Sequence, residues 1–201
     1  MIRIAVFVSG GGTNLQALLD AQESGALHSG RIALVVSSRP GVFALERAEA
    51  AGIPSVVVSR ADCADQAAFE EKLLTALEAH GIDMIVLAGF LSILSADFTA
   101  RFPQRILNVH PSLIPSFCGR GFYGLKVHEA ALACGVKVTG ATVHYVNEIP
   151  DGGQILLQKA VEVLPGDTPE RLQRRVMEQA EWVLLPQAAE LVAARLENER
   201  S

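Results

Sequence analysis

The sequence predicts an α/β fold: a Rossmann-like, mostly parallel sheet with helices on both faces, a β-rich C-terminal half and a C-terminal helix. Short β-branched runs alternate with segments of helical periodicity through the first half of the chain. Residues 84–88 form an uninterrupted apolar run, which is typical of a strand that helices cover on both faces. Alternating strands and helices with short turns indicate right-handed βαβ units, and therefore a parallel sheet.

The first half supplies four predicted strands and three predicted helices. Gly52 is expected to end the second helix as a C-cap, and Pro54 favours an edge position for the strand that follows. In the third helix, Phe69, Leu73 and Leu77 share one apolar face. In chain order the elements are a strand over 2–8, a helix over 14–22, a strand over 31–37, a helix over 42–51, a strand over 53–58, a helix within 64–80 and a strand over 84–88.

The second half has a different pattern. Residues 138–145 and 155–163 are predicted strands, separated by a turn at 150–153, which suggests a hairpin or a β-rich edge. The tail is predicted to be helical, with Thr168 as N-cap and Pro169 at the first helical position. Pro186 is expected to kink or restart this last helix.

Composition narrows the class of protein. The 201 residues are 50% hydrophobic and carry a formal net charge of −5, which indicates one folded domain and argues against binding nucleic acid through charge alone. No apolar run approaches the roughly 20 residues that span a bilayer, and the first residues do not resemble a signal peptide. Cys63, Cys118 and Cys134 lack metal-type spacing, so we expect a reducing, cytoplasmic setting without a membrane or a metal.

A glycine-rich segment, Ser9-Gly10-Gly11-Gly12-Thr13-Asn14, follows the first predicted strand and precedes a helix. Glycines let backbone N–H groups approach an anion, and a helix N-terminus favours negative charge, so the segment predicts a phosphate site. The alternative is a tight turn that Thr13 or Asn14 caps. The segment is neither a P-loop nor a good dinucleotide fingerprint, since no Gly-Lys-Ser/Thr follows and Leu15 replaces the third glycine.

The strongest candidate for catalysis is Asn108-Val109-His110-Pro111-Ser112-Leu113-Ile114-Pro115. Residues two apart on a strand point to one side, so the Asn108 amide and the His110 imidazole can meet at one point. An amide stabilises a developing oxyanion, and an imidazole transfers protons near neutral pH. Asp151, before two glycines, adds a carboxylate. The alternatives are a structural histidine and a solvated Asp-Gly turn.

The remaining histidines and cysteines give weaker indications. His144 lies in an apolar run and is interpreted as either packed or facing a ligand, without a catalytic assignment. His28, His80 and His128 are expected in surface or helical positions, and Cys118 is interpreted as a small residue of a glycine-rich loop. No cluster has the spacing of metal ligands.

Several of these motifs together resemble the phosphoribosylglycinamide formyltransferase family, also called glycinamide ribonucleotide transformylases, in the formyltransferase superfamily. The resemblance runs from about residue 2 to 190, and the motifs occur in the family's order. It rests on the segments 8–16 (VSGGGTNLQ), 87–90 (LAGF), 108–115 (NVHPSLIP) and 143–146 (VHYV) followed by Asp151-Gly152-Gly153.

The resemblance implies the formyltransferase fold over 1–201, with a ribonucleotide phosphate-binding half (about 1–105) and a catalytic and folate-binding half (about 106–201). It implies formyl transfer from 10-formyltetrahydrofolate, as co-substrate, to the amine of 5-phosphoribosylglycinamide in de novo purine biosynthesis, by a monomer or homodimer acting on small molecules without a metal.

It also implies roles for individual residues. Asn108, His110 and Asp151 match the catalytic trio. Gly11, Gly12, Thr13 and Asn14 match the phosphate loop, and Glu181 matches a ribonucleotide contact after a one-residue shift. The folate contacts implied are Phe90, Leu91, Ser92, Ile93, Leu94, Val146, Asn147, Glu148 and Asp151. Ser92 replaces a basic residue of some members, and the glycine-rich loop 116–124 is longer than in some.

Other functions remain open at this level. A formyltetrahydrofolate hydrolase or a formyltransferase for another small amine fits the same trio. An initiator-tRNA formyltransferase needs a further nucleic-acid-binding domain. An NADP-dependent reductase, with Arg39 binding the 2′-phosphate, conflicts with the broken glycine fingerprint. A non-catalytic nucleotide-binding module leaves the trio without a purpose.

Overall fold

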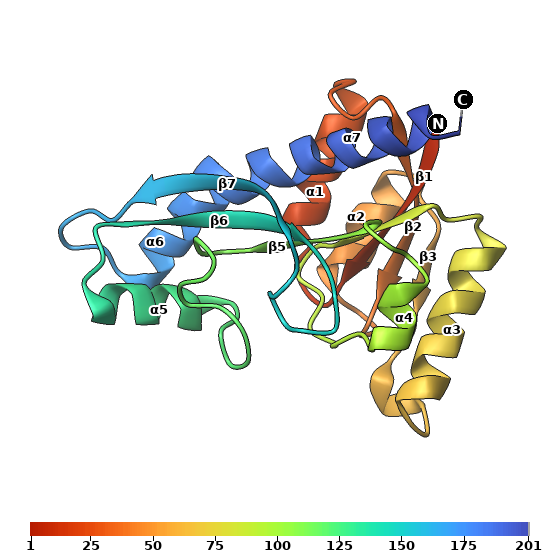
Figure 1. The fold of residues 1–201 in the computed structure, drawn as a ribbon, viewed down its shortest axis with the longest axis horizontal. Coiled ribbons are helices and arrows are strands. Elements are labelled where there is room, and N and C mark those ends of the chain that lie inside the picture. Colours follow the sequence, from red (N-terminus) through yellow and green to blue (C-terminus); the bar gives the residue numbers. More distant parts are fainter. Residues whose placement is uncertain (201) are drawn as a thin grey trace.

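One seven-stranded sheet runs through the computed structural model, which describes residues 1–200 (Figure 1). The strand order is β3-β2-β1-β4-β5-β6-β7. The first five strands are mutually parallel, whereas β6 is antiparallel to both β5 and β7. The strands are β1 Ile2–Val8, β2 Gly30–Ser37, β3 Ser55–Val57, β4 Met84–Leu87, β5 Ile106–His110, β6 Val138–Tyr145 and β7 Ile155–Glu162.

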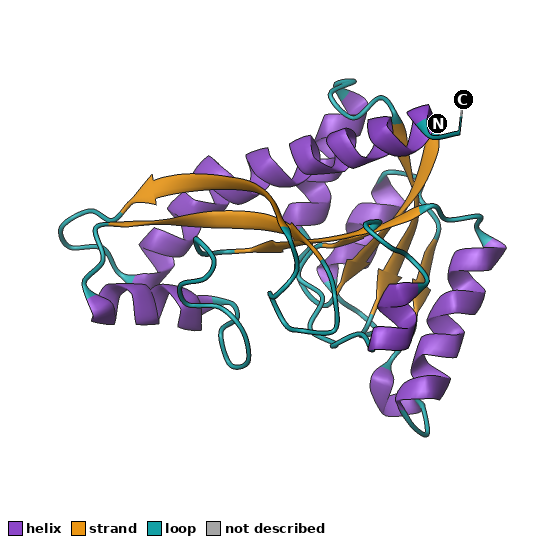
Figure 2. Cartoon of the chain, in the orientation of Figure 1, coloured by secondary structure: helices purple, strands orange, loops and turns teal. Residues whose placement is uncertain are grey.

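Helices cover both faces of the parallel part of the sheet, as Figure 2 shows, which confirms the predicted fold class. Short 3₁₀ and π segments occupy Arg60–Asp62 and Met177–Glu181. The α-helices are α1 Thr13–Glu23, α2 Phe43–Ala50, α3 Gln66–Ala79, α4 Ala96–Ala100, α5 Leu125–Cys134, α6 Pro169–Val176 and α7 Trp182–Asn198. Within residues 1–200, none of these helices is long and apolar enough to cross a membrane.

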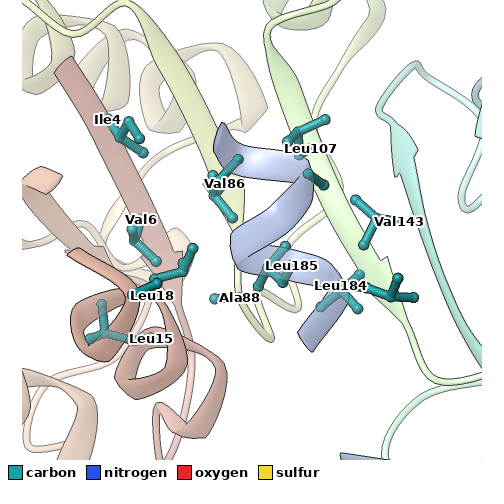
Figure 3. Packing of buried hydrophobic residues seen from close by; sticks show 14 of the residues in the cluster. Ile4, Val6, Leu15, Leu18, Val86, Ala88, Leu107, Val143, Leu184 and Leu185 are labelled. Carbon is teal, nitrogen blue, oxygen red and sulfur yellow. The ribbon is translucent and has the colours of Figure 1, made fainter. Parts of the chain in front are cut away.

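The core has two layers because strand side chains alternate between the faces of the sheet. On β1, Ile4 and Val6 pack into a cluster with buried residues of α1, α2 and α7, whereas Ala5 and Phe7 pack with α3 and α4. Figure 3 shows the first layer, with Leu185 of α7 lying against the sheet. Both faces of β1 are therefore buried, which explains its uninterrupted apolar run from Ile4 to Val8.

Local signals place several element boundaries as predicted. Thr168 caps α6 by accepting from the Arg171 N–H, as predicted, and Asp65 adds an unpredicted cap to α3 by accepting from the Ala68 N–H. Gly52 follows α2 with φ 66°, as a C-terminal glycine does. The strand after Pro54 is the short edge strand β3. The residues on either side of the 150–153 turn form the hairpin β6–β7.

The restart predicted at Pro186 is wrong, because α7 continues through this residue. The irregular turn lies earlier, at the π segment Met177–Glu181. A proline removes only one N–H donor, and the π turn before it already shifts the hydrogen-bond register of the helix. The register therefore changes before the proline is reached.

Candidate active site

The carboxyl ends of the parallel strands surround a cavity of about 840 Å³. Segments after β1, β2, β4 and β5 line it, together with the glycine-rich loop around residue 120, the turn at Asp151 and the π segment. Parallel α/β sheets bind ligands at this edge, because successive loops converge there. The cavity includes Thr13, Asn108, His110 and Asp151, so it collects residues that are far apart in the sequence.

The glycine-rich segment forms the β1–α1 turn and leaves part of its backbone open. A Cβ on Gly10 or Gly11 would meet no atom within 4 Å. Gly12 has φ 71°, and a Cβ there would lie 2.7 Å from the Ala44 Cβ, so glycine is required where the turn packs on α2. No side chain caps α1, so the alternative of a turn capped by Thr13 or Asn14 is wrong. Free N–H groups at this helix start suit an anion.

Asn14 and Glu181 are brought together across the cavity wall. The Asn14 Nδ2 donates to the Glu181 Oε2 over 2.8 Å, and both side chains are buried. Burial raises the pKa of the Glu181 carboxyl, against the opposing effect of the Asn14 hydrogen bond. One N–H of the Asn14 amide is thus engaged with Glu181.

Glu181→Gln is expected to stabilise the protein at alkaline pH. A buried carboxyl with a raised pKa destabilises the fold when it ionises, and this cost disappears as the pH falls towards the ordinary value of 4.5. Glutamine keeps an acceptor for Asn14 without the charge. Thermal unfolding should show a Tm higher by about 2 °C or more at pH 8, and little difference near pH 4.5. A variant less stable than the parent at pH 8 would contradict this assignment.

Asn108, His110 and Asp151 meet, as the sequence predicts. His110 Nδ1 lies 3.4 Å from Asp151 Oδ2, and Asn108 Nδ2 lies 3.4 Å from Asp151 Oδ1. The first two residues are on β5 and the third is in the turn before β7. His110 is only 4% exposed, so the pair interacts in a setting that screens charge weakly.

The turn that carries Asp151 has a demanding backbone. Asp151 has φ 56°, a conformation uncommon for residues other than glycine and enriched in Asp and Asn. A Cβ on Gly153 would lie 1.7 Å from the Tyr145 carbonyl oxygen, so only glycine fits there. Burial raises the pKa of the Asp151 carboxyl, but hydrogen bonding with His144, the charge of His110 and the Gly119 N–H outweigh burial, and the net pKa is below 3.8. Asp151 is therefore ionised at neutral pH.

Backbone groups of the glycine-rich loop 116–124 form hydrogen bonds with two members of the trio, His110 and Asp151. The His110 Nε2 donates to the Phe117 carbonyl oxygen over 2.9 Å, and the Gly119 N–H donates to Asp151 Oδ2 over 2.8 Å. Phe117 has φ 50°, which is costly for an aromatic residue. The loop that the sequence left without an assignment thus connects the imidazole to the carboxylate.

His144, for which the sequence left a packed or a ligand-facing position open, lies beside the trio. Its Nδ1 donates to the Tyr145 carbonyl, 2.8 Å away, which leaves Nε2 as an acceptor for the Asn108 amide at 3.1 Å when the ring is neutral. The same Nε2 is 3.6 Å from Asp151 Oδ1. Antiparallel pairing places His144 directly opposite Asn108, a register that the sequence alone does not specify.

His128 is in a helical position, as expected: it lies on α5, where its side chain is fully buried, whereas His28 is exposed. Burial, together with the charge of nearby His110, lowers the His128 pKa to about 4, so the ring is neutral at physiological pH. One helical face of α5 turns Val127, His128 and Ala131 inward, which the short apolar pattern did not reveal.

Only some of the residues that the resemblance implies for folate binding line the cavity. Phe90, Leu91 and Ile93 line the cavity, and Leu91 and Ile93 are more than half exposed. Leu94 is buried in the core beside α3 and α4 and does not line the cavity. In the described part of the chain the cavity lining also leaves out Ser92, Val146, Asn147 and Glu148.

A family model described as formyl transferase matches residues 2–188. This chain belongs to the formyl transferase family. Among solved structures, the glycinamide ribonucleotide transformylase 1 of Symbiobacterium toebii is similar to this formyl transferase, with 44% identity, a TM-score of 0.90, and coverage of 97% of this chain and 89% of the other. The shared fold and identity confirm the family that the motifs indicated.

Longer curated relatives match this formyl transferase over part of their length. The trifunctional purine biosynthetic protein adenosine-3 of Drosophila melanogaster is 42% identical, over 94% of this chain and 14% of the relative. The chloroplastic phosphoribosylglycinamide formyltransferase of Arabidopsis thaliana is 40% identical, over 87% of this chain and 60% of the relative. The chain therefore spans less than two thirds of the length of these curated relatives.

The charged side chains of the formyl transferase site do not form a metal centre. Among residues 1–200 no group of three or more His, Cys, Asp and Glu side chains is arranged to hold a metal ion. The cysteines Cys63, Cys118 and Cys134 are free thiols. What the site offers is an amide, two imidazoles and a carboxylate beside an open glycine-rich turn.

Proposed function

We propose that this chain transfers the formyl group of 10-formyltetrahydrofolate to the amine of 5-phosphoribosylglycinamide, in purine biosynthesis. The observation that carries the proposal is the convergence of Asn108, His110 and Asp151 in one cavity with the open glycine-rich turn. The similar proteins named as phosphoribosylglycinamide formyltransferases support the same substrates.

In this mechanism the substrate amine attacks the formyl carbon, and the carbonyl oxygen becomes a tetrahedral oxyanion. The Asn108 amide and protonated His110 donate hydrogen bonds to that oxygen, where one such donor is worth roughly 100- to 1000-fold in rate. Asp151 accepts a proton, through water, from the attacking nitrogen. The oxyanion then re-forms the carbonyl as the C–N bond to the tetrahydrofolate nitrogen breaks, and the proton that Asp151 accepted passes through water to that leaving nitrogen.

The mechanism requires an exchange of partners at His110. Its Nε2 is bound to the Phe117 carbonyl and its Nδ1 faces Asp151, so both ring nitrogens are occupied. A formyl oxygen therefore has to replace the Phe117 carbonyl, by a shift of the glycine-rich loop. Asp151 can stay in place and keep the imidazolium paired while this happens.

Different parts of the cavity would bind the ribonucleotide and the folate. Gly11, Gly12 and Thr13 provide backbone donors for the phosphate, and Glu181 faces the ribonucleotide from the π segment. Leu91 and Ile93 are exposed and Phe90 is half-buried, and together they give the apolar surface that an aromatic pterin suits. The free cysteines support a reducing, cytoplasmic setting, and we propose a monomer or homodimer.

The test of the proposed function is tetrahydrofolate production from 10-formyltetrahydrofolate, measured with and without 5-phosphoribosylglycinamide. A transferase releases tetrahydrofolate only when the acceptor is present, and the formylated amine appears in equal amount. Release that does not depend on the acceptor would show a hydrolase instead. Release with other small amines, but not with this one, would overturn the choice of acceptor.

Thr13→Ala is expected to weaken binding of the ribonucleotide more than it slows the chemistry. Thr13 lines the cavity at the first residue of α1, where its hydroxyl can bond the phosphate. Loss of a hydrogen bond to a charged group should raise the KM for the ribonucleotide by roughly 10-fold, with a smaller change in kcat. Steady-state kinetics measure both, and an unchanged KM would remove Thr13 from the phosphate site.

A further inference from the structure

The proposed phosphate site has hydrogen-bond donors but needs positive charge. A ribonucleotide phosphate carries about two negative charges at neutral pH, and the cavity wall already includes the carboxyls of Asp151 and Glu181. A helix N-terminus offers only about half an elementary charge. Arg47, on α2, is engaged elsewhere, because its guanidinium donates to the Gly11 carbonyl and to the Gln16 side chain. Another cation is therefore needed.

Among the described residues that line the cavity, the basic ones are Arg39 and Arg120. Arg39 follows β2, and β2 is the direct neighbour of β1, whose end carries the glycine-rich turn. The Ser9 and Ser38 hydroxyls are 2.6 Å apart, and the Ser38 N–H donates to the Val8 carbonyl over 3.0 Å. These bonds hold the C-terminal ends of β1 and β2 together. Arg39 directly follows Ser38, so it lies next to the glycine-rich turn.

The side chain of Arg39 is also available. Its backbone is fixed, since Arg39 N–H donates to the Ser37 hydroxyl, and that hydroxyl donates to the Arg39 carbonyl. In contrast, no hydrogen bond or ion pair within residues 1–200 holds its guanidinium, which is exposed. Arg120 lies instead beside Gly119, which contacts Asp151 near the reacting groups.

We propose that Arg39 is a binding residue that pairs its guanidinium with the phosphate of the ribonucleotide. This rests on the proposed function and adds to it the charged group that the glycine-rich turn lacks. Arginine suits the role because its planar fork donates two parallel hydrogen bonds to phosphate oxygens. The pair fixes the far end of the substrate so that the amine reaches the formyl carbon. Selectivity for phosphorylated acceptors is then a property of this residue.

The test compares two acceptors, 5-phosphoribosylglycinamide and the riboside that lacks the phosphate. Arg39→Ala should lower kcat/KM for the ribonucleotide by roughly 10- to 100-fold and leave kcat/KM for the riboside within about twofold. Arg39→Lys should fall between the parent and the alanine variant, because it keeps the charge. Arg31→Ala is the matched control, an exposed arginine at the other end of β2, and should change neither value.

A binding measurement tests the role of Arg39 independently of formyl transfer. Ribose 5-phosphate, titrated calorimetrically, should bind Arg39→Ala at least about 10-fold more weakly than the parent and Arg31→Ala. This result needs no formyl transfer, so it can hold even if the parent fails to formylate the ribonucleotide. Equal losses for both acceptors, or equal ribose 5-phosphate affinity in parent and Arg39→Ala, would overturn the role of Arg39.

Discussion

Asp151→Asn is expected to lower kcat by roughly 100- to 10,000-fold, the contribution of a positioned general base. Asparagine has the same shape, tolerates the positive φ of this turn, and can still accept from the Gly119 N–H. It loses the negative charge that faces His110 Nδ1 and His144 Nε2, and it no longer accepts the proton of the attacking amine. Binding of folate and ribonucleotide should remain within a few-fold of the parent.

Pre-steady-state kinetics with saturating substrates measure the loss at the chemical step, and equilibrium titrations check binding. Asp97→Asn is a suitable control, because Asp97 is an exposed carboxylate on α4, away from the cavity lining. A kcat near that of the parent in Asp151→Asn would refute the role of the carboxylate. A large rise in the Kd of either substrate would instead make Asp151 a binding residue.

His110→Ala is expected to lower kcat by roughly 100- to 1000-fold, since it removes a donor to the oxyanion. The replacement also leaves the Phe117 carbonyl without its partner and opens space in a buried position. His110→Gln keeps an N–H group in the same region, so it should retain more turnover than the alanine variant.

Folding has to be separated from chemistry in the His110 variants. The Tm of each variant, measured against parent and the exposed-site control His28→Ala, reports any loss of structure. A kcat within about threefold of the parent in folded His110→Ala would contradict the oxyanion role.

The parallel half of the fold could be predicted because its central strands are covered on both faces. β1 and β4 have no polar side chains in their centres, and such runs are typical of buried parallel strands. Gly52 and Pro54 marked a helix end and an edge strand by backbone chemistry that holds in any fold. The restart predicted at Pro186 does not occur. The irregular turn is the π segment before the proline, which already changes the hydrogen-bond register of the helix.

The site could be predicted only where its residues are close in sequence or share a known motif. Asn108 and His110 are two apart on one strand, so their convergence follows from strand geometry. His144 required the register of an antiparallel pair, which depends on packing over the whole sheet. The Asn14–Glu181 hydrogen bond joins residues 167 apart, on α1 and in the π segment, and no local pattern in the sequence predicts such a contact.

The most direct test of the catalytic trio is a crystal structure with 5-phosphoribosylglycinamide and a stable folate analogue that carries a carbonyl in place of the formyl group. We expect the carbonyl oxygen to lie within about 3 Å of both the Asn108 amide nitrogen and a His110 ring nitrogen, with the Phe117 carbonyl displaced. The Asp151 carboxylate should lie within reach of the amine, directly or through one water. A carbonyl oxygen that contacts neither Asn108 nor His110 would refute the oxyanion role of these two residues.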